Sequence, residues 1–86
     1  MLLPMALFFV NYDLIKRKDY QTLWNRLEQW GAKRVLLSTW AIRRDNTTAA
    51  AIRDDLRQYV DGDDRLFVDQ SETWAGWNAM LDANKV

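Results

Sequence analysis

The chain has 86 residues, of which 49% are hydrophobic, and its 12 basic residues balance 12 acidic ones. This length suits one domain with a modest core, and the zero net charge gives no global sign of nucleic-acid binding. The absence of Cys and His excludes disulfides, thiol nucleophiles, the usual zinc sites and any mechanism with a histidine base. An enzyme of this composition would work with carboxylates, hydroxyls, Lys, Arg and, where needed, a hard cation.

The first five residues, Met1–Met5, are apolar and lead directly into a strand pattern. No basic segment precedes them and the apolar run stops at Asn11, so the segment has the features of neither a signal peptide nor a membrane span. We expect residues 1–5 to be a disordered extension, with Met5 as the natural start. The expectation for residues 1–86 is a single soluble, cytoplasmic domain.

Residues Ala6–Asp13 predict a strand buried on both faces, because the run is short and rich in aromatic and β-branched side chains. Its polar end would hold the Asp13 carboxylate rigidly at the edge of the core, where ligands can reach it. Such a carboxylate suits a divalent metal ion. It suits a plain strand-to-loop cap equally well, and this residue alone leaves both interpretations open.

A helix is predicted next from one apolar stripe at helical spacing, formed by Tyr20, Leu23, Trp24, Leu27 and Trp30. Asp19 is expected to cap its start and Gly31 to end it. Three cations, Lys16, Arg17 and Lys18, lie just before this helix. They fit a solvated loop, and they also fit a phosphate contact assisted by the helix N-terminus.

Lys33 to Arg44 predicts extended chain in two apolar segments. Ser38–Thr39 lies between the segments, and it lacks the Gly, Pro or Asn of a tight turn. A long bent strand and a hairpin with an unusual connection therefore both fit.

Capping residues predict that a second helix starts at about Thr48, and it should stop at Asp61–Gly62. A last short strand is predicted at Arg65–Gln70. The segment from Asp61 to Glu72 imitates a calcium-binding loop, but Leu66 occupies the position that requires Gly. We therefore interpret its beginning as a polar turn.

The order strand, helix, strand, strand, helix, strand predicts an α+β, ferredoxin-like fold, with both helices on one face of an antiparallel sheet. The other face needs a cover, and a second copy of the chain is the simplest one, assisted by the C-terminal tail, residues 71–86. One side of a possible short helix in this tail would carry Trp74, Trp77 and Leu81, but Gly76 weakens that helix, so that docking would be needed to form it. The candidate interface residues are Tyr12, Trp40, Trp74 and Trp77.

No pair of neighbouring carboxylates stands out within one chain. A two-fold axis near the end of the first strand would bring two Asp13 side chains face to face, where they could hold one divalent cation. Such a site would support hydrolysis with a single carboxylate from each chain. The hypothesis requires the two Asp13 side chains to be close together in the dimer.

Five short motifs occur in a characteristic order: Tyr12–Asp13, Ser38–Thr39–Trp40, Ile52–Arg53–Asp54–Asp55–Leu56, Asp64–Arg65–Leu66 and Trp74–Ala75–Gly76–Trp77. On these motifs the chain resembles the small CRISPR-associated adaptation and endoribonuclease family, the second core protein of that system. The virulence-associated D toxins are relatives of that family. The match is closer to its SinR-like branch and covers nearly the whole chain from Met5.

The resemblance implies a ferredoxin-like homodimer whose sheets face each other, with Asp13 in the position of the family's metal-binding Asp. Ser38 would assist by hydrogen bonding near the site. For some members the family implies hydrolysis of RNA or DNA with magnesium or manganese, and for others it implies duplex binding beside an integrase. The candidate phosphate contacts are Lys16, Arg17, Lys18, Arg43 and Arg44.

Two classes of function stay open. One is a metal-dependent endonuclease, of which a toxin-like ribonuclease is a variant with the same site. The other is a non-catalytic dimeric scaffold that binds nucleic acid or a protein. The neutral net charge disfavours duplex binding, because a dimer that bridges DNA should carry a basic stripe.

Overall fold

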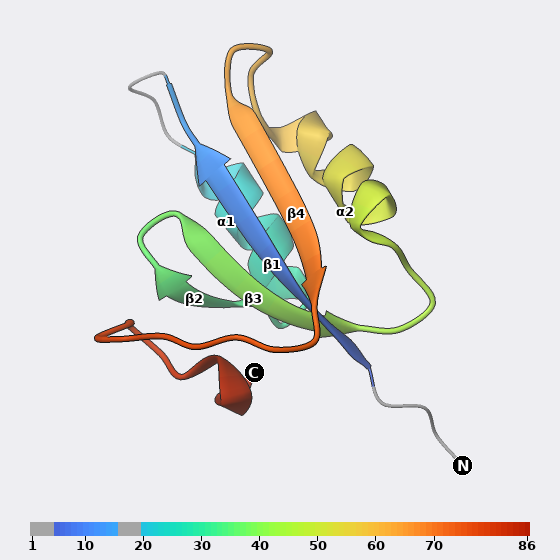
Figure 1. The fold of residues 1–86 in the computed structure, drawn as a ribbon. Helices are drawn as coiled ribbons and strands as arrows, with labels where there is room; N and C mark the ends of the chain where they lie inside the picture. Colours follow the sequence, from blue (N-terminus) through green and yellow to red (C-terminus); the bar gives the residue numbers. More distant parts are fainter. Residues whose placement is uncertain (1–4, 16–19) are drawn as a thin grey trace.

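The computed structural model describes residues 5–15 and 20–86 as one antiparallel sheet with two helices on one face (Figure 1). The strands lie in the order β2-β3-β1-β4. Along the chain the elements are β1 (Ala6–Asp13), α1 (Gln21–Gln29), β2 (Lys33–Leu36), β3 (Thr39–Arg44), α2 (Ala49–Leu56), the short helix η1 (Arg57–Tyr59), β4 (Arg65–Ser71) and the short helix η2 (Ala83–Lys85). This topology confirms the predicted ferredoxin-like α+β fold.

β1 is the centre of the molecule, because it pairs with β3 on one side and with β4 on the other. Its side chains alternate between the two faces of the sheet. Phe8, Val10 and Tyr12 belong to the core beneath the helices, with Phe8 and Val10 fully buried. The helices contribute Leu23, Leu27, Ile52 and Leu56 to the same core. The apolar residues predicted to lie on one side of each helix and in the first strand therefore form this main core.

The C-terminal end of α1 has a clear physical cause. Gly31, the residue after the C-cap Trp30, has a φ of 77°. The N–H of Gly31 donates to the carbonyl of Glu28, and that of Ala32 donates to the carbonyl of Leu27. This pair of bonds is the Schellman motif, which needs a left-handed residue and so favours Gly. At the other end, Tyr20 occupies the N-cap position without a side-chain cap, and Asp19, the predicted cap, lies outside the described residues.

The start of α2 matches the prediction, because the Thr48 hydroxyl accepts a hydrogen bond from the N–H of Ala51 at 3.1 Å. This bond satisfies one of the free N–H groups of the first turn.

The segment from Lys33 to Arg44 is a hairpin with an unusual connection, which decides between the two predicted alternatives. Leu36 faces Thr39, so only Leu37 and Ser38 connect the strands. Neither connecting residue has a positive φ, so the turn is not one of the mirror-image turns that usually close two-residue hairpins. The register shifts between Arg34 and Leu36, and this irregularity in β2 allows the strands to meet without such a turn.

The C-terminal tail differs from its prediction, because it forms no helix across residues 74–81. Asn78 has a left-handed backbone, with a φ of 54°, which interrupts helical geometry. The tail instead crosses the sheet face opposite the helices (Figure 1). It forms a second, smaller core there, which consists of Leu7, Val35, Ala41 and Ala83, with Phe9, Trp74, Leu81 and Val86 packed against it. The cover is partial, and the end of the sheet near Asp13 stays open.

No helix within residues 5–15 and 20–86 has the length and apolar character that crossing a membrane requires.

One ion pair joins the two helices and gives a pH prediction. Arg26 donates to both carboxylate oxygens of Asp55, at 2.9 and 2.7 Å. This hydrogen bond from Arg26 holds the pKa of Asp55 below its ordinary value, with the charges of Arg26 and Arg44 as further causes. A carboxylate with a lowered folded-state pKa stabilises the fold above the ordinary pKa of about 3.9, and this contribution is lost as the pH falls through the folded value.

We expect Asp55→Asn to be less stable than wild type at pH 7 and to lose less stability when the pH is lowered from 5 to 2. Urea midpoints across this range test the expectation. Asp54→Asn is the matched control, because Asp54 pairs with its exposed neighbour Arg53, where solvent screens the interaction. If wild type and Asp55→Asn lost the same amount of stability between pH 5 and pH 2, the lowered pKa of Asp55 would not contribute to the pH dependence.

Candidate functional site

A depression of about 490 Å³ lies at one end of the sheet, and it contains both residues that the sequence proposed for catalysis. Its lining comes from three places: the end of β1, the β2–β3 connection and the start of β4. The residues are Asn11, Tyr12, Asp13, Ser38, Thr39, Arg65, Leu66 and Phe67. The antiparallel registers bring these segments together, since Asn11 faces Thr39 on one side and Asp13 faces Arg65 on the other.

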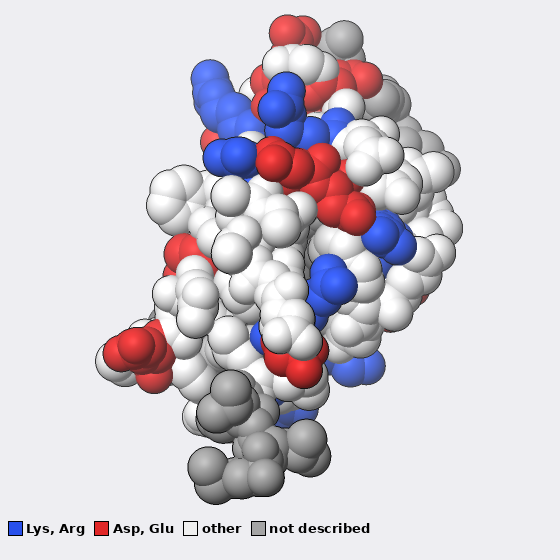
Figure 2. All heavy atoms as spheres, turned by 90° about the vertical axis from the view of Figure 1, so that its right-hand side faces the viewer, with Lys and Arg blue, Asp and Glu red and all other residues white. Residues whose placement is uncertain are grey.

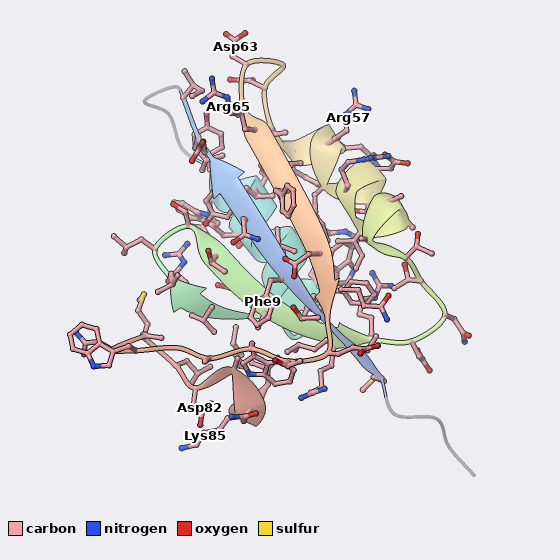
Figure 3. All side chains as sticks on the ribbon, in the orientation of Figure 1. Phe9, Arg57, Asp63, Arg65, Asp82 and Lys85 are labelled. Carbon is pink, nitrogen blue, oxygen red and sulfur yellow. The ribbon has the colours of Figure 1, made fainter. Side chains whose placement is uncertain are left out.

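Asp13 is accessible and already faces a cation. Its carboxylate lies 3.7 Å from the Arg65 guanidinium, and the two side chains are 69% and 75% exposed. An ion pair this exposed contributes little to stability and is easily exchanged for another partner. Figure 3 shows Arg65 at the start of β4, next to the turn that carries Asp63.

The floor of the depression is a fixed polar row. The Thr39 hydroxyl donates to the Asn11 side-chain oxygen at 2.8 Å, and the Asn11 side-chain nitrogen donates to the Phe67 carbonyl at 3.3 Å. Ser38 is exposed, and its carbonyl accepts from the N–H of Tyr12 at 3.1 Å. These bonds fix the backbone on both sides of Asp13. Asn11 and Thr39 were absent from the predicted site, although their position beside Asp13 and Ser38 in the sequence was a usable signal.

One protomer does not supply a full set of metal ligands. Within the described part of the chain, no three carboxylates lie close enough together to hold a metal ion. Asp13 stands opposite a guanidinium, which repels a cation. A divalent ion would therefore fit this site only if another carboxylate came from a second copy of the chain and Arg65 moved away.

The two predicted basic residues within the described part of the chain lie on opposite faces of the sheet. Arg43 and Arg44 are neighbours on β3 and therefore point to opposite faces of the sheet. Arg43 donates to the carbonyl of Val86 at 2.7 Å and lies over the Trp74 ring, so it holds the tail. Arg44 lies on the helix side, with its guanidinium carbon 4.5 Å from the Trp30 ring centroid. The other predicted phosphate contacts, Lys16, Arg17 and Lys18, lie outside the described residues.

Two of the predicted interface residues lie in the core instead. Tyr12 is 6% exposed and Trp40 is 5% exposed. The Tyr12 hydroxyl accepts from the indole nitrogens of Trp24 and Trp40, at 3.1 and 2.9 Å. Arg34 stacks on both rings, 5.0 Å from the centroid of Trp24 and 4.8 Å from that of Trp40. This internal cluster accounts for aromatic side chains that the sequence assigned to a partner surface.

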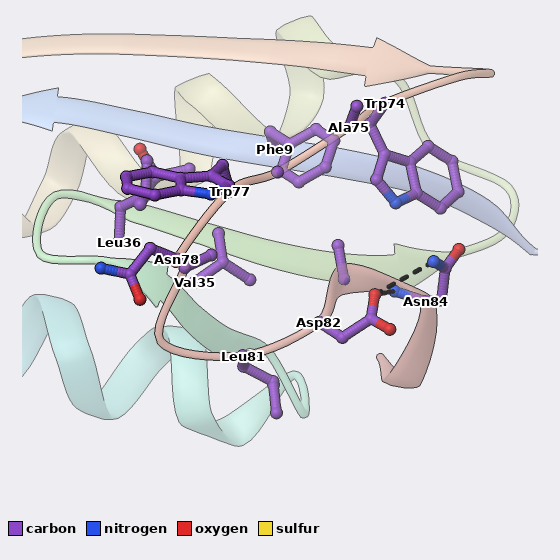
Figure 4. A pocket seen from close by; sticks show the side chains of 14 residues that line it. Phe9, Val35, Leu36, Trp74, Ala75, Trp77, Asn78, Leu81, Asp82 and Asn84 are labelled. Atoms are coloured by element: carbon purple, nitrogen blue, oxygen red, sulfur yellow. Dashed lines mark hydrogen bonds between the residues drawn. The ribbon is translucent and has the colours of Figure 1, made fainter.

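The other two predicted interface residues lie in the tail and differ in exposure. Trp74 is half-buried and packs edge-to-face on Phe9 at 6.1 Å, whereas Trp77 is 90% exposed. Both line a hollow of about 700 Å³ between the tail and the sheet, which the sequence did not predict (Figure 4). In Figure 4, Phe9 and Val35 lie on the sheet side, while Asp82 and Asn84 are bonded to each other on the tail side.

Comparison with known proteins leaves the family open. No protein-family model matches the chain, and no solved structure matches it.

Proposed function

We propose that the protein is a cytoplasmic homodimer that processes nucleic acid by hydrolysing phosphodiester bonds at the Asp13 depression. One observation carries this proposal: Asp13 and Ser38, which are distant in the sequence, line the same accessible depression at the end of the sheet that the tail leaves open. The sequence resemblance to the CRISPR-associated endoribonuclease family puts Asp13 in the position of that family's metal-binding Asp.

The residues of the depression have distinct roles in this proposal. Two copies meet through their open sheet faces, and the two Asp13 carboxylates would hold a shared magnesium or manganese ion. Such an ion would supply Lewis-acid activation of the phosphate and of water. Arg65, released from Asp13, is placed to contact the phosphate, and Ser38 is placed to donate a hydrogen bond to it. The polar row of Asn11 and Thr39 keeps the strand end rigid.

A second function, a non-catalytic dimeric scaffold that binds nucleic acid or a protein, has its own support. The Asp13–Arg65 pair already neutralises the carboxylate. This feature fits a surface used for binding rather than for hydrolysis.

The test is cleavage of labelled single-stranded RNA and duplex DNA with magnesium or manganese. We expect Asp13→Ala to reduce cleavage to the level of a reaction without protein, while Asp54→Ala retains it. Asp54 is the matched control, because it is an exposed carboxylate on α2, on the opposite side of the sheet from the depression. Circular dichroism and sedimentation establish that both variants are folded and assembled as the wild type is.

Cleavage that persists in Asp13→Ala would place the activity elsewhere or in a contaminant. Absence of cleavage by folded, dimeric wild type would favour the scaffold function. Arg65→Ala tests the two roles of Arg65 separately. If Arg65 contacts the phosphate, the variant should cleave more slowly. If Arg65 competes with the cation for Asp13, the variant should bind manganese more tightly.

A further inference from the structure

The two edges of the sheet differ in how they are protected from pairing with another chain. β2 has four residues, carries the register irregularity, and its Val35 carbonyl accepts a hydrogen bond from the tail at Met80. β4 has seven residues, and its register with β1 runs from Arg65 to Ser71 without interruption. Exposed edges are usually blunted by bulges, prolines, short length or a covering segment. Within residues 5–15 and 20–86, the outer edge of β4 has none of these features.

The backbone groups that β4 leaves unpaired can be identified from the alternation of antiparallel bonds. The N–H of Tyr12 bonds to Ser38 toward β3, so its neighbours on β1, Asn11 and Asp13, bond toward β4. Their opposite residues, Phe67 and Arg65, therefore direct their backbone groups toward β1. The alternate residues of β4, Leu66, Val68 and Gln70, direct theirs outward.

The side chains of β4 are self-complementary about Phe67. Phe67 is 68% exposed on the open face of the sheet, and Arg65 and Asp69 lie two residues away on either side of it. In Figure 2, which faces this side of the molecule, blue and red groups lie against each other in the upper part, and no continuous band of one charge is seen. A strand that pairs with its own copy about Phe67 places each Arg65 opposite an Asp69.

We propose that β4 is an interface strand, which pairs in the antiparallel direction with β4 of a second copy and has Phe67 on the two-fold axis. Leu66 of each copy then faces Val68 of the other, and their outward backbone groups form four hydrogen bonds. The two Phe67 side chains meet at a non-hydrogen-bonded position, where side chains approach most closely. The product is a continuous eight-stranded sheet.

A register centred on Val68 would also satisfy outward backbone groups, but its side chains match poorly. It would put Phe67 opposite Asp69 and Arg65 opposite Ser71. The register centred on Phe67 replaces these pairs with one aromatic pair and two opposite-charge pairs, each of which favours cross-strand pairing. The charges on the strand therefore select the register.

This pairing is independent of the proposed hydrolysis. In the paired sheet, the two Asp13 residues are separated by three interstrand spacings, about 14 Å, across the sheet. They are also separated by four residues, about 14 Å, along the strand direction. The edge contact therefore cannot form the shared cation site, which needs the open faces to meet. The edge contact shares Arg65, Leu66 and Phe67 with the lining of the depression, but it does not include Asp13 or Ser38.

The absence of native Cys gives a direct crosslinking test. Phe67→Cys puts two thiols opposite each other at a non-hydrogen-bonded pair, where Cα atoms are about 4.5 Å apart, within the range of a disulfide. Asp69→Cys is the matched control, since the register holds the two residues at position 69 about 14 Å apart. With a mild oxidant at low protein concentration, we expect rapid covalent dimers of Phe67→Cys alone. Equal rates for the two variants would overturn the register.

Charge reversal tests the same contact without removing Phe67. Arg65→Asp and Asp69→Arg each place like charges in both pairs, and each should raise the dimer Kd about tenfold in sedimentation equilibrium. The double variant restores opposite charges and should return the Kd to near its wild-type value. Arg57→Asp, an exposed change on η1, should leave the Kd unchanged. A monomeric wild type, or a double variant weaker than both single variants, would overturn the proposal.

Discussion

Replacing Phe8 with Ala should lower the free energy of unfolding by about 3–5 kcal/mol. Phe8 lies in the middle of β1 with an exposed fraction of 0%, and it belongs to the core that both helices cover. Removing the ring loses the favourable free energy of burying it away from water. It also leaves a cavity, and the surrounding sheet cannot collapse easily into it because β1 has strands on both sides. A domain of this size has a total stability of about 5–15 kcal/mol, so the loss is a large share of it.

Urea unfolding measures this effect, and the protein concentration is kept fixed because self-association would make the apparent stability depend on concentration. Leu37→Ala is the matched control, since Leu37 is 78% exposed in the β2–β3 connection. It should change the free energy of unfolding by less than about 0.5 kcal/mol. A loss below about 1 kcal/mol in Phe8→Ala would mean that Phe8 is not the centre of the core.

Replacing Tyr12 with Phe should cost about 2–3 kcal/mol, although it removes a single oxygen. That hydroxyl accepts hydrogen bonds from the indoles of both Trp24 and Trp40. Because Trp40 is buried, its N–H would be left without an acceptor, and the desolvation cost of an unpaired donor exceeds the value of an ordinary hydrogen bond.

Tyr59→Phe provides the comparison, because Tyr59 is half-buried and donates no hydrogen bond that fixes another side chain within the described residues. It should change stability by less than about 0.5 kcal/mol. Chemical denaturation gives the free energies, and near-ultraviolet circular dichroism reports whether the packing of Trp24 and Trp40 changes in Tyr12→Phe. Equal effects of the two variants would show that the indoles find other acceptors.

Local patterns predicted most of the fold. The apolar period of residues 20–30 and the left-handed preference of Gly31 depend only on neighbours in the sequence, and so does the Thr48 cap. The sequence did not decide between a bent strand and a hairpin for the β2–β3 segment. The hairpin depends on an irregularity in β2, and no Gly, Pro or Asn in the connection indicates it. The possible short helix of the tail does not form, since the path of the tail is set by docking on Leu7 and Val35 from elsewhere in the chain.

The candidate site required long-range information. Asp13 was found because it ends a buried strand, but its pairing with Arg65 depends on the β1–β4 register. The separation of Arg43 from Arg44 was predictable from the sequence, because neighbouring residues of a strand point to opposite faces. Tyr12 and Trp40 were assigned to a partner surface because the sequence has many aromatic residues, and the stacking of Arg34 on Trp24 and Trp40 cannot be read from spacing.

Arg43 joins two parts of the chain that are far apart in the sequence. Its guanidinium donates to the backbone oxygen of Val86 at 2.7 Å and, more weakly, to the carbonyl of Met5 at 3.5 Å. The residue before β1 and the end of the tail are thus tied to each other through one side chain on β3. A change at Arg43 would therefore loosen the tail and the start of β1 together.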